Sequence, residues 1–155
     1  MNTEDSRQEP AEHARFAAYL VELEQVADAD ESGLVGEVLA DPDPVMARAA
    51  VVRHLDRRAA RLWCEPGWEE WGEAMARVVT GHPFLMRRLQ EWSLFRAVAL
   101  RLPWHRDDLL ASSDWLQLKT AAGTNPEALR VLAGSGRTKR IRNTARTGLG
   151  RRGTG

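Results

Sequence analysis

The stretch from Asn125 to Leu149 constrains the fold more than any other part of the chain. Asn125 is a good helix N-cap, Pro126 suits the first helical position, and Gly134-Ser135-Gly136 ends the helix. A second short helix is expected to start near Thr138. Because each of these helices is apolar on one side only, the pair must stack on neighbouring helices to bury those sides. The stretch therefore predicts an all-α fold of stacked helical hairpins.

The repeat-like part of this stretch reads Pro-x-x-Leu-x-x-Leu-Ala, then a short turn, then Ile-Arg and a small residue. It begins at Pro126, and its Ile-Arg pair is Ile141-Arg142. The pattern resembles a HEAT-type repeat or a leucine-rich repeat variant (LRV) of bacterial α-helical repeat proteins. The resemblance implies a short α-solenoid of about four stacked helical hairpins, whose general mode of action is to hold a partner.

The resemblance is best over residues 113–149 and 34–62, and in the second of these segments the stretch from Leu39 through Pro44 to Leu55 is similar to the turn and second helix of a HEAT repeat. It departs from the family pattern because the position that usually holds arginine is Ala47, and the arginine is Arg48. An internal period favours the repeat interpretation, since three Pro-led helix starts lie 39 and 43 residues apart, at Asp43-Pro44, His82-Pro83 and Asn125-Pro126. The alternative is a compact helical bundle in which these prolines are incidental caps.

Apolar periodicity and breaker residues divide the chain into short helices without any strand signal. We expect residues 1–10 to be a disordered lead, 11–149 to form a single helical-repeat domain, and 150–155 to be a flexible basic tail. The predicted helices cover 11–28, 32–41, 44–63, 68–81, 83–102, 106–111, 113–122, 125–134 and about 138–149.

Charge is unevenly distributed along the chain. The whole sequence has a net charge of zero, but residues 1–43 carry a net charge of −10 and residues 128–155 carry +8. Such asymmetry favours an anionic partner at the C-terminal end, or attraction between the two ends of one molecule or of two copies. A homodimer is therefore one of the predicted outcomes.

The C-terminal segment is basic and contains no acidic residue. Lys139, Arg142 and Arg146 share one face of the last predicted helix, and the other face is apolar. Guanidinium groups on such a face suit phosphate or carboxylate. The predicted anion-binding residues are Arg137, Lys139, Arg140, Arg142, Arg146, Arg151 and Arg152. Alternatively, this end only keeps the array soluble, or it docks on the acidic N-terminal third.

Six tryptophans fall within 53 residues in the middle of the chain. Large aromatic side chains in a small helical protein usually form core. The sharper hypothesis is an aromatic groove, made by Trp68, Trp71 and Trp104, that stacks on a base or grips a peptide. The combination of HEAT-like repeats with Trp and Asp is also similar to helical-repeat DNA glycosylases, which would draw on Trp104 with Asp107 or Asp108.

No other pattern indicates catalysis, a metal or a cofactor. The four histidines are not spaced as metal ligands, and His54 is expected on the helix surface. The only cysteine, Cys64, is expected to be buried. The adjacent carboxylates Glu69-Glu70 and Asp107-Asp108 are typical of solvated helix faces. We predict no membrane span and a cytoplasmic location, because no apolar run is long enough and the first ten residues are polar.

Three functions follow from this sequence, in order of preference. The first is a non-catalytic adaptor or regulatory module that binds a protein partner. The second is a nucleic-acid-binding protein that uses the basic C-terminal helix and tail and is therefore sensitive to salt. The third is a base-excising enzyme of the glycosylase type.

Overall fold

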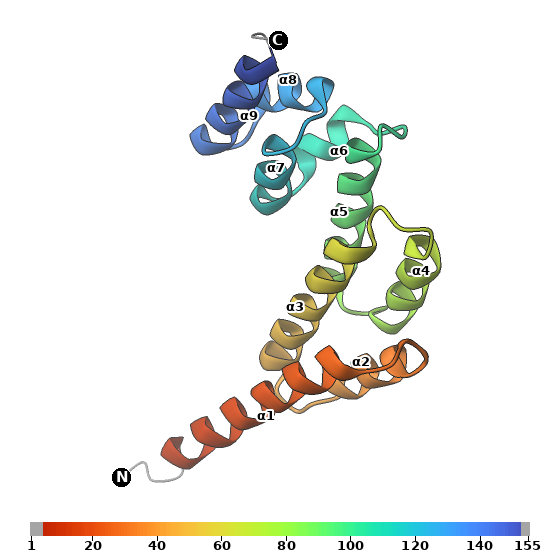
Figure 1. Cartoon of the computed structure of the whole chain (residues 1–155). Helices are drawn as coiled ribbons and strands as arrows, with labels where there is room; N and C mark the ends of the chain where they lie inside the picture. Colours follow the sequence, from red (N-terminus) through yellow and green to blue (C-terminus); the bar gives the residue numbers. More distant parts are fainter. Residues whose placement is uncertain (1–4, 153–155) are drawn as a thin grey trace. The chain divides into compact units, whose positions relative to one another are not determined.

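The computed structural model describes the backbone of residues 5–152 and the side chains of residues 11–151. Within these residues the protein is all-helical and has no strand, as predicted. The chain divides into two compact units, Met1–Leu89 (unit 1) and Gln90–Gly155 (unit 2). Figure 1 shows the helices in sequence colours. None of the helices in the described part is long and apolar enough to cross a membrane.

In the described residues, unit 1 is built from four α-helices, one 3₁₀ turn and the start of a fifth α-helix. They are α1 (Asp5–Gln25), the 3₁₀ turn η1 (Asp28–Asp30), α2 (Glu31–Leu39), α3 (Pro44–Leu62), α4 (Trp68–Val78) and residues 83–89 of α5 (Pro83–Ala99). Helix α3 packs on α1 and α2, and α2 also packs on α4. Val51, Leu55 and Met75 are among the buried side chains of this core.

The start of α3 shows why the Asp-Pro pattern correctly predicts a helix start. Asp43 Oδ1 accepts hydrogen bonds from the backbone N–H groups of Val45 and Met46, both at 3.1 Å. Pro44 occupies the first helical position, where no backbone donor is needed. The predicted cap and helix start are confirmed.

Unit 2 contains residues 90–99 of α5, followed by α6 (Arg106–Ala111), α7 (Asp114–Ala121), α8 (Pro126–Ser135) and α9 (Lys139–Arg152). Helices α7, α8 and α9 pack on one another (Figure 1). Their shared core consists of Val98, Leu109, Ala121, Ala128, Leu129, Leu132, Ile141 and Ala145. The predicted caps Ser113 and Asn125 accept bonds from the first turns of α7 and α8, which confirms both starts.

Gly136 allows α8 and α9 to approach each other closely. A Cβ atom at this position would lie 2.6 Å from the Leu132 carbonyl oxygen and 2.7 Å from Ile141 Cγ2. Both distances are shorter than packed atoms tolerate, so a side chain would force the turn apart. The glycine predicted to end the helix therefore also fixes how tightly the hairpin closes.

The ends of the chain differ from the expected boundaries. Helix α1 begins at Asp5, so part of the expected disordered lead 1–10 is helical; residues 1–4 lie outside the described residues. Helix α9 continues to Arg152, through the first half of the expected flexible tail 150–155; residues 153–155 lie outside the described residues. A helix extends at little cost once it has nucleated, and each glycine lowers the stability of the helix by only about 1 kcal/mol.

The free thiol of Cys64 is exposed, which corrects the expectation of a buried one.

Candidate anion-binding surface and pocket

Helix α9 separates apolar from basic side chains, as its sequence predicts. Ile141 and Ala145 are 1% and 0% exposed, and Leu149 packs against the same core. The basic side chains of Lys139, Arg140, Arg146 and Arg151 are exposed. Because the apolar side of α9 is anchored in the core, these cations are presented from a fixed helix.

At least three of the predicted anion-binding residues have partners inside unit 2, and one of them is Arg146, whose Nη1 donates to Asn143 Oδ1 at 3.4 Å. Arg137 Nη1 lies 2.8 Å from Asp114 Oδ1, and its Nη2 donates to the Leu110 carbonyl. Arg142 Nη1 donates to the Gly136 carbonyl at 2.8 Å. Arg137 and Arg142 hold the α8–α9 turn in place and are less available to a partner. The side chain of Arg152, also in the predicted set, lies outside the described residues.

A buried glutamine, missed from the sequence, fixes the same turn. Gln117 is fully buried; its Nε2 donates to the carbonyls of Leu109 and Leu110 at 3.1 Å, and its Oε1 accepts from the Arg137 backbone N–H at 2.9 Å. From the spacing of apolar residues, a polar residue at this position in a helix is expected to be exposed to solvent. A single sequence therefore gives no indication that Gln117 is buried.

The three tryptophans of the predicted groove belong to different units of the chain. Trp68 and Trp71 are 5% and 7% exposed and belong to the core of unit 1, with ring centroids 5.5 Å apart. Trp71 Nε1 also donates to the buried Glu31 carboxylate at 3.1 Å. Both rings are buried in the core of unit 1, and Trp71 also lines an open pocket of about 260 Å³ beside Glu31 and Arg58. Trp104 lies in unit 2 and is partly exposed.

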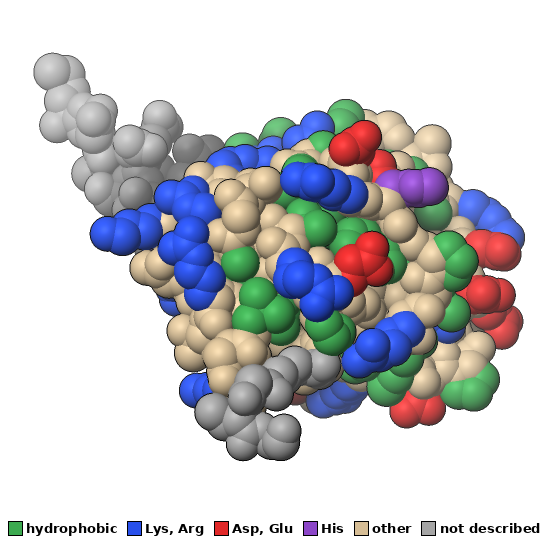
Figure 2. Space-filling model, turned by 90° about the horizontal axis from the view of Figure 1, so that it is seen from above, with side chains coloured by type: hydrophobic (Ala, Val, Ile, Leu, Met, Phe, Trp, Pro, Cys, Tyr) green, Lys and Arg blue, Asp and Glu red, His purple; other side chains and the backbone are tan. Residues whose placement is uncertain are grey.

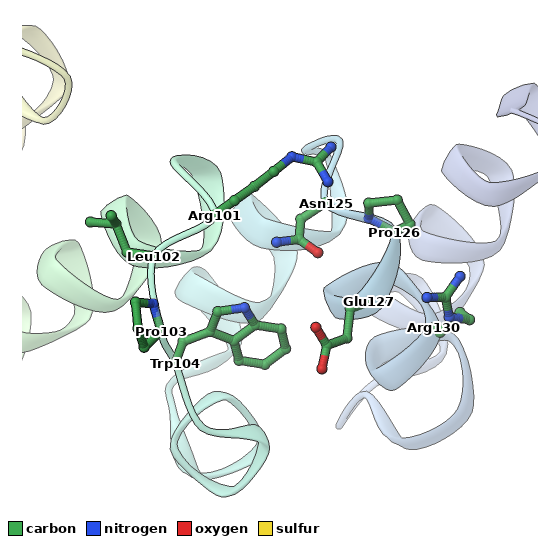
Figure 3. A pocket seen from close by; sticks show the side chains of 8 residues that line it. All are labelled: Arg101, Leu102, Pro103, Trp104, Asn125, Pro126, Glu127 and Arg130. Carbon is green, nitrogen blue, oxygen red and sulfur yellow. The ribbon is translucent and has the colours of Figure 1, made fainter.

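Trp104 lines an open pocket of about 520 Å³ between the segment that follows α5 and the start of α8. Figure 3 shows Glu127 extending toward the indole of Trp104, Arg101 extending toward Asn125, and Arg130 farther from the indole than Glu127 is. The full lining is Arg101, Leu102, Pro103, Trp104, Asn125, Pro126, Glu127 and Arg130. Asp107 and Asp108, considered with Trp104 for an excision enzyme, do not line it, so nothing here favours that activity.

The charged side chains of this pocket have no partners of their own. Among the described residues, Arg101, Arg130 and Glu127 form no side-chain hydrogen bond or ion pair. Asn125, by contrast, is saturated: its Nδ2 donates to the Val98 carbonyl at 2.8 Å, and its Oδ1 accepts from the Ala128 N–H. Asn125 therefore holds the pocket wall, whereas the two arginines and the glutamate are available to a ligand.

Arg101 occupies a backbone conformation that usually belongs to glycine. Its φ angle is 59°, in the left-handed region. The Leu102 N–H bonds to the Ala97 carbonyl at 2.8 Å, and the Arg101 N–H bonds to the Val98 carbonyl at 3.3 Å, which is the Schellman pattern of a helix end. A non-glycine residue in this conformation costs about 1–2 kcal/mol. In unit 1 the comparable left-handed position is filled by Gly81, with φ 89°.

Unit 1 contains a buried cluster that the sequence did not indicate. Glu31 is 3% exposed, and its carboxylate accepts from His54 Nε2 at 2.6 Å, Arg58 Nε at 3.0 Å and Trp71 Nε1 at 3.1 Å. Burial alone would raise the pKa of Glu31. The hydrogen bonds from His54, Trp71 and Arg58, with the charge of Arg58, outweigh burial and lower that pKa to about 2.

His54 is 2% exposed, so the expectation of a surface histidine was wrong. Its Nδ1 lies 3.1 Å from an Arg57 Nη2, which can only donate, so the neutral ring carries its proton on Nε2 and donates it to Glu31. This polar side chain can lie on the inward face of α3 because Glu31, on α2, accepts its hydrogen bond. With its lone pairs occupied, Glu31 ties α2, α3 and α4 together and has no free oxygen for acid–base chemistry.

The two units carry opposite charge. Unit 1 has 17 acidic and 10 basic residues, and unit 2 has 5 acidic and 12 basic residues, giving net charges of −7 and +7. Figure 2 shows a face on which Lys and Arg side chains lie at several separate places, with hydrophobic side chains between them.

Comparisons with protein-family models, curated proteins and solved structures gave no match. Function must therefore be inferred from the residues themselves.

Proposed function

We propose that this protein is a non-catalytic helical module that binds nucleic acid through its basic C-terminal unit. The observation that carries the proposal is α9, which has no acidic residue and exposes Lys139, Arg140, Arg146 and Arg151 from a helix anchored in the core. Guanidinium groups pair with phosphate oxygens in a charge-assisted, two-pronged geometry. Phosphate contacts of this kind supply most of the affinity of sequence-independent nucleic-acid binding.

The charge of unit 2 supports the same proposal. With 12 basic and 5 acidic residues, the unit has a surplus of at least seven cations that no carboxylate of its own can neutralise. A polyanion releases its counterions when it meets such a surface, so binding should weaken steeply as salt rises. This proposal takes the protein to be cytoplasmic.

We also propose the finer fold expected from the sequence, a short α-solenoid of HEAT-like or LRV-like hairpins. The α8–α9 hairpin, with α7 packed on both of its helices, supports a stacked arrangement within unit 2. Solving the structure by crystallography at near-atomic detail, with both units in one lattice, tests whether the hairpins stack in register.

The deciding experiment replaces exposed cations without touching the core. Removing residues 137–155 would also delete Ile141 and Ala145 from the core, so loss of binding would not be informative. The better variant combines Lys139→Gln, Arg140→Gln and Arg146→Gln. Its matched control combines Arg53→Gln, Arg61→Gln and Arg87→Gln, three exposed arginines of unit 1.

Binding is measured with labelled duplex and single-stranded oligonucleotides at two salt concentrations. We expect salt-dependent binding that the α9 variant weakens by about 10-fold or more, following the loss of three phosphate contacts. The control should bind nearly as well as the parent protein. No binding by the parent at low salt, or equal loss in both variants, would rule the proposal out.

The second candidate is the protein adaptor, and one observation in unit 1 favours it. Val45 and Phe84 are 66% and 47% exposed, and the Arg48 guanidinium lies 5.1 Å from the Phe84 ring centroid. Exposed aromatic and arginine side chains often dominate protein interfaces. If this patch binds a protein, Phe84→Ala should abolish capture of a defined partner while oligonucleotide binding is unchanged. An unaltered set of captured proteins would argue against the patch.

The partner of the adaptor could also be a second copy of the chain. The net charges of −7 and +7 on the two units would attract each other between molecules. Light scattering at low salt and high concentration should then show a dimer that dissociates as salt rises. A monomeric mass at low salt would remove the homodimer from consideration.

A further inference from the structure

We propose that the pocket beside Trp104 holds one nucleotide of a single strand and prefers a base with an amino group on its pairing edge. The base lies on Trp104, the flanking phosphates meet Arg101 and Arg130, and Glu127 accepts from the amino group. This inference rests on the nucleic-acid-binding function proposed above. It adds a site and a base preference that α9, with only phosphate contacts, does not supply.

The indole supplies the stacking surface. Trp104 is partly exposed and packs its other side against the core of unit 2, so its ring is held in place. Base-on-aromatic stacking contributes about 1–3 kcal/mol per base in single-strand binding proteins. The pocket volume of about 520 Å³ falls within the usual range for small-molecule sites, and its open mouth lets a chain continue on either side.

The two arginines supply the phosphate contacts. Arg101 comes from the turn after α5 and Arg130 from the second turn of α8, and neither has a partner among the described residues (Figure 3). Arg101 also holds the left-handed conformation that glycine would occupy without strain. Residues kept in such conformations are concentrated at functional sites, which is consistent with a role for this side chain.

Glu127 is what makes the pocket selective. A carboxylate in the same pocket as two phosphate-binding arginines repels phosphate, so it favours a ligand that brings a hydrogen-bond donor to it. Cytosine presents its N4 amino group, with two N–H donors, at the end of its pairing edge, and glutamate is a known acceptor for it. Thymine and uracil present a single N3–H donor that lies between the O4 and O2 acceptors. An acceptor facing a carboxylate is disfavoured. The pocket should therefore bind cytosine better than thymine.

The test compares labelled 12-nucleotide strands of deoxycytidine and thymidine at neutral pH. One specific base contact changes affinity by about 5- to 100-fold, so we expect the parent protein to bind the cytidine strand at least about fivefold more tightly. Glu127→Ala should abolish this preference and strengthen thymidine binding, because it removes an anion from the site. The matched control is Asp108→Ala, which removes an exposed first-turn acid of α6 outside the pocket. It should leave the preference intact.

Three further variants separate stacking from phosphate contacts. Trp104→Leu keeps an apolar contact with the core and should weaken both strands by about fivefold or more without changing the salt dependence. Arg101→Gln and Arg130→Gln should each reduce the slope of log affinity against log salt by about 1. Circular dichroism of each variant confirms that the helices are retained.

The outcomes distinguish the pocket from the function on which it rests. The proposed base preference of the pocket would be overturned if the parent protein bound the two strands equally, or if the preference survived Glu127→Ala. In either case, the proposed function would still stand if the α9 variant lost binding. Absence of binding to either strand would overturn both. A preference that disappears in Glu127→Ala and persists in Asp108→Ala would establish the site.

Discussion

The two units contain nearly the same number of basic residues, 10 and 12, but place them differently. In unit 1 several arginines are paired with carboxylates of the same unit: Arg15 with Asp41, Arg58 with Glu31 and Asp28, and Arg88 with Asp56. In unit 2, basic residues outnumber acidic ones by more than two to one, so most cannot be paired within the unit.

This difference shows that residue type alone does not decide what an arginine does. Arg58 is anchored by a carboxylate that is itself buried, so it contributes to the stability of unit 1. Arg140 is exposed on a helix without acidic residues, so its charge is available to a partner. Substitutions in unit 1 should therefore lower stability, and substitutions in unit 2 should lower binding.

The largest effect is expected at the buried cluster of unit 1. Glu31→Ala leaves His54, Arg58 and Trp71 facing each other without their acceptor, and loss of one partner of a buried charged cluster costs about 3–5 kcal/mol. Urea unfolding measures the change, with Glu37→Ala on the exposed side of α2 as control. A loss no larger than that of the control would show that the cluster does not stabilise unit 1.

Acid should weaken the same cluster. The pKa of Glu31 is about 2 in the folded protein and about 4.5 in the unfolded chain, so the folded carboxylate stays ionised where the unfolded one is protonated. The contribution is therefore complete above about pH 5 and is lost as pH falls toward 2, and 2.5 pKa units correspond to about 3 kcal/mol. Glu31→Gln should make the free energy of unfolding, measured in urea, depend less on pH between about pH 5 and pH 2. If the pH dependence is unchanged, it arises from other carboxylates.

A matched pair of arginine substitutions sharpens the comparison. Arg58→Gln removes hydrogen bonds to a buried carboxylate and should lower the free energy of unfolding by about 1–3 kcal/mol. Arg140→Gln changes only an exposed charge and should stay within about 0.5 kcal/mol of the parent. Thermal or urea unfolding measures both. Equal effects would break the distinction between structural and available arginines.

The smallest effect has the opposite sign. Arg101→Gly should raise the free energy of unfolding by about 0.5–1 kcal/mol, because relief of left-handed strain outweighs the added freedom of glycine in the unfolded chain. The same variant should bind single strands more weakly. A loss of stability would mean that the Arg101 side chain contributes to the fold of unit 2 and not only to its pocket.

The helices and their caps could be predicted because they depend on neighbours in the sequence. Asp43, Ser113 and Asn125 cap the helices that they precede, and the apolar face of α9 follows from the spacing of Ile141 and Ala145. These features rest on local hydrogen bonds and helical periodicity, which a single sequence displays.

The buried polar residues and the pocket could not be predicted, because each depends on residues far apart in the chain. His54 is inward only because Glu31 lies opposite on another helix, and Gln117 only because Leu109 and the Arg137 turn need its amide. Apolar patterns count such residues as solvent-exposed. Trp104 attracted attention for its residue type, but nothing local indicates that Glu127 and Arg130 lie beside it.

With nucleic acid bound as proposed, the opposite charges of the two units also limit how many strands one molecule binds. A strand that occupies unit 2 neutralises the +7 of that unit, and the complex then has the −7 of unit 1 together with the remaining phosphates. A second strand would approach a net anion and be repelled, most strongly at low ionic strength. If the proposed function holds, a loaded molecule would therefore take up a second strand less readily than the free protein takes up the first.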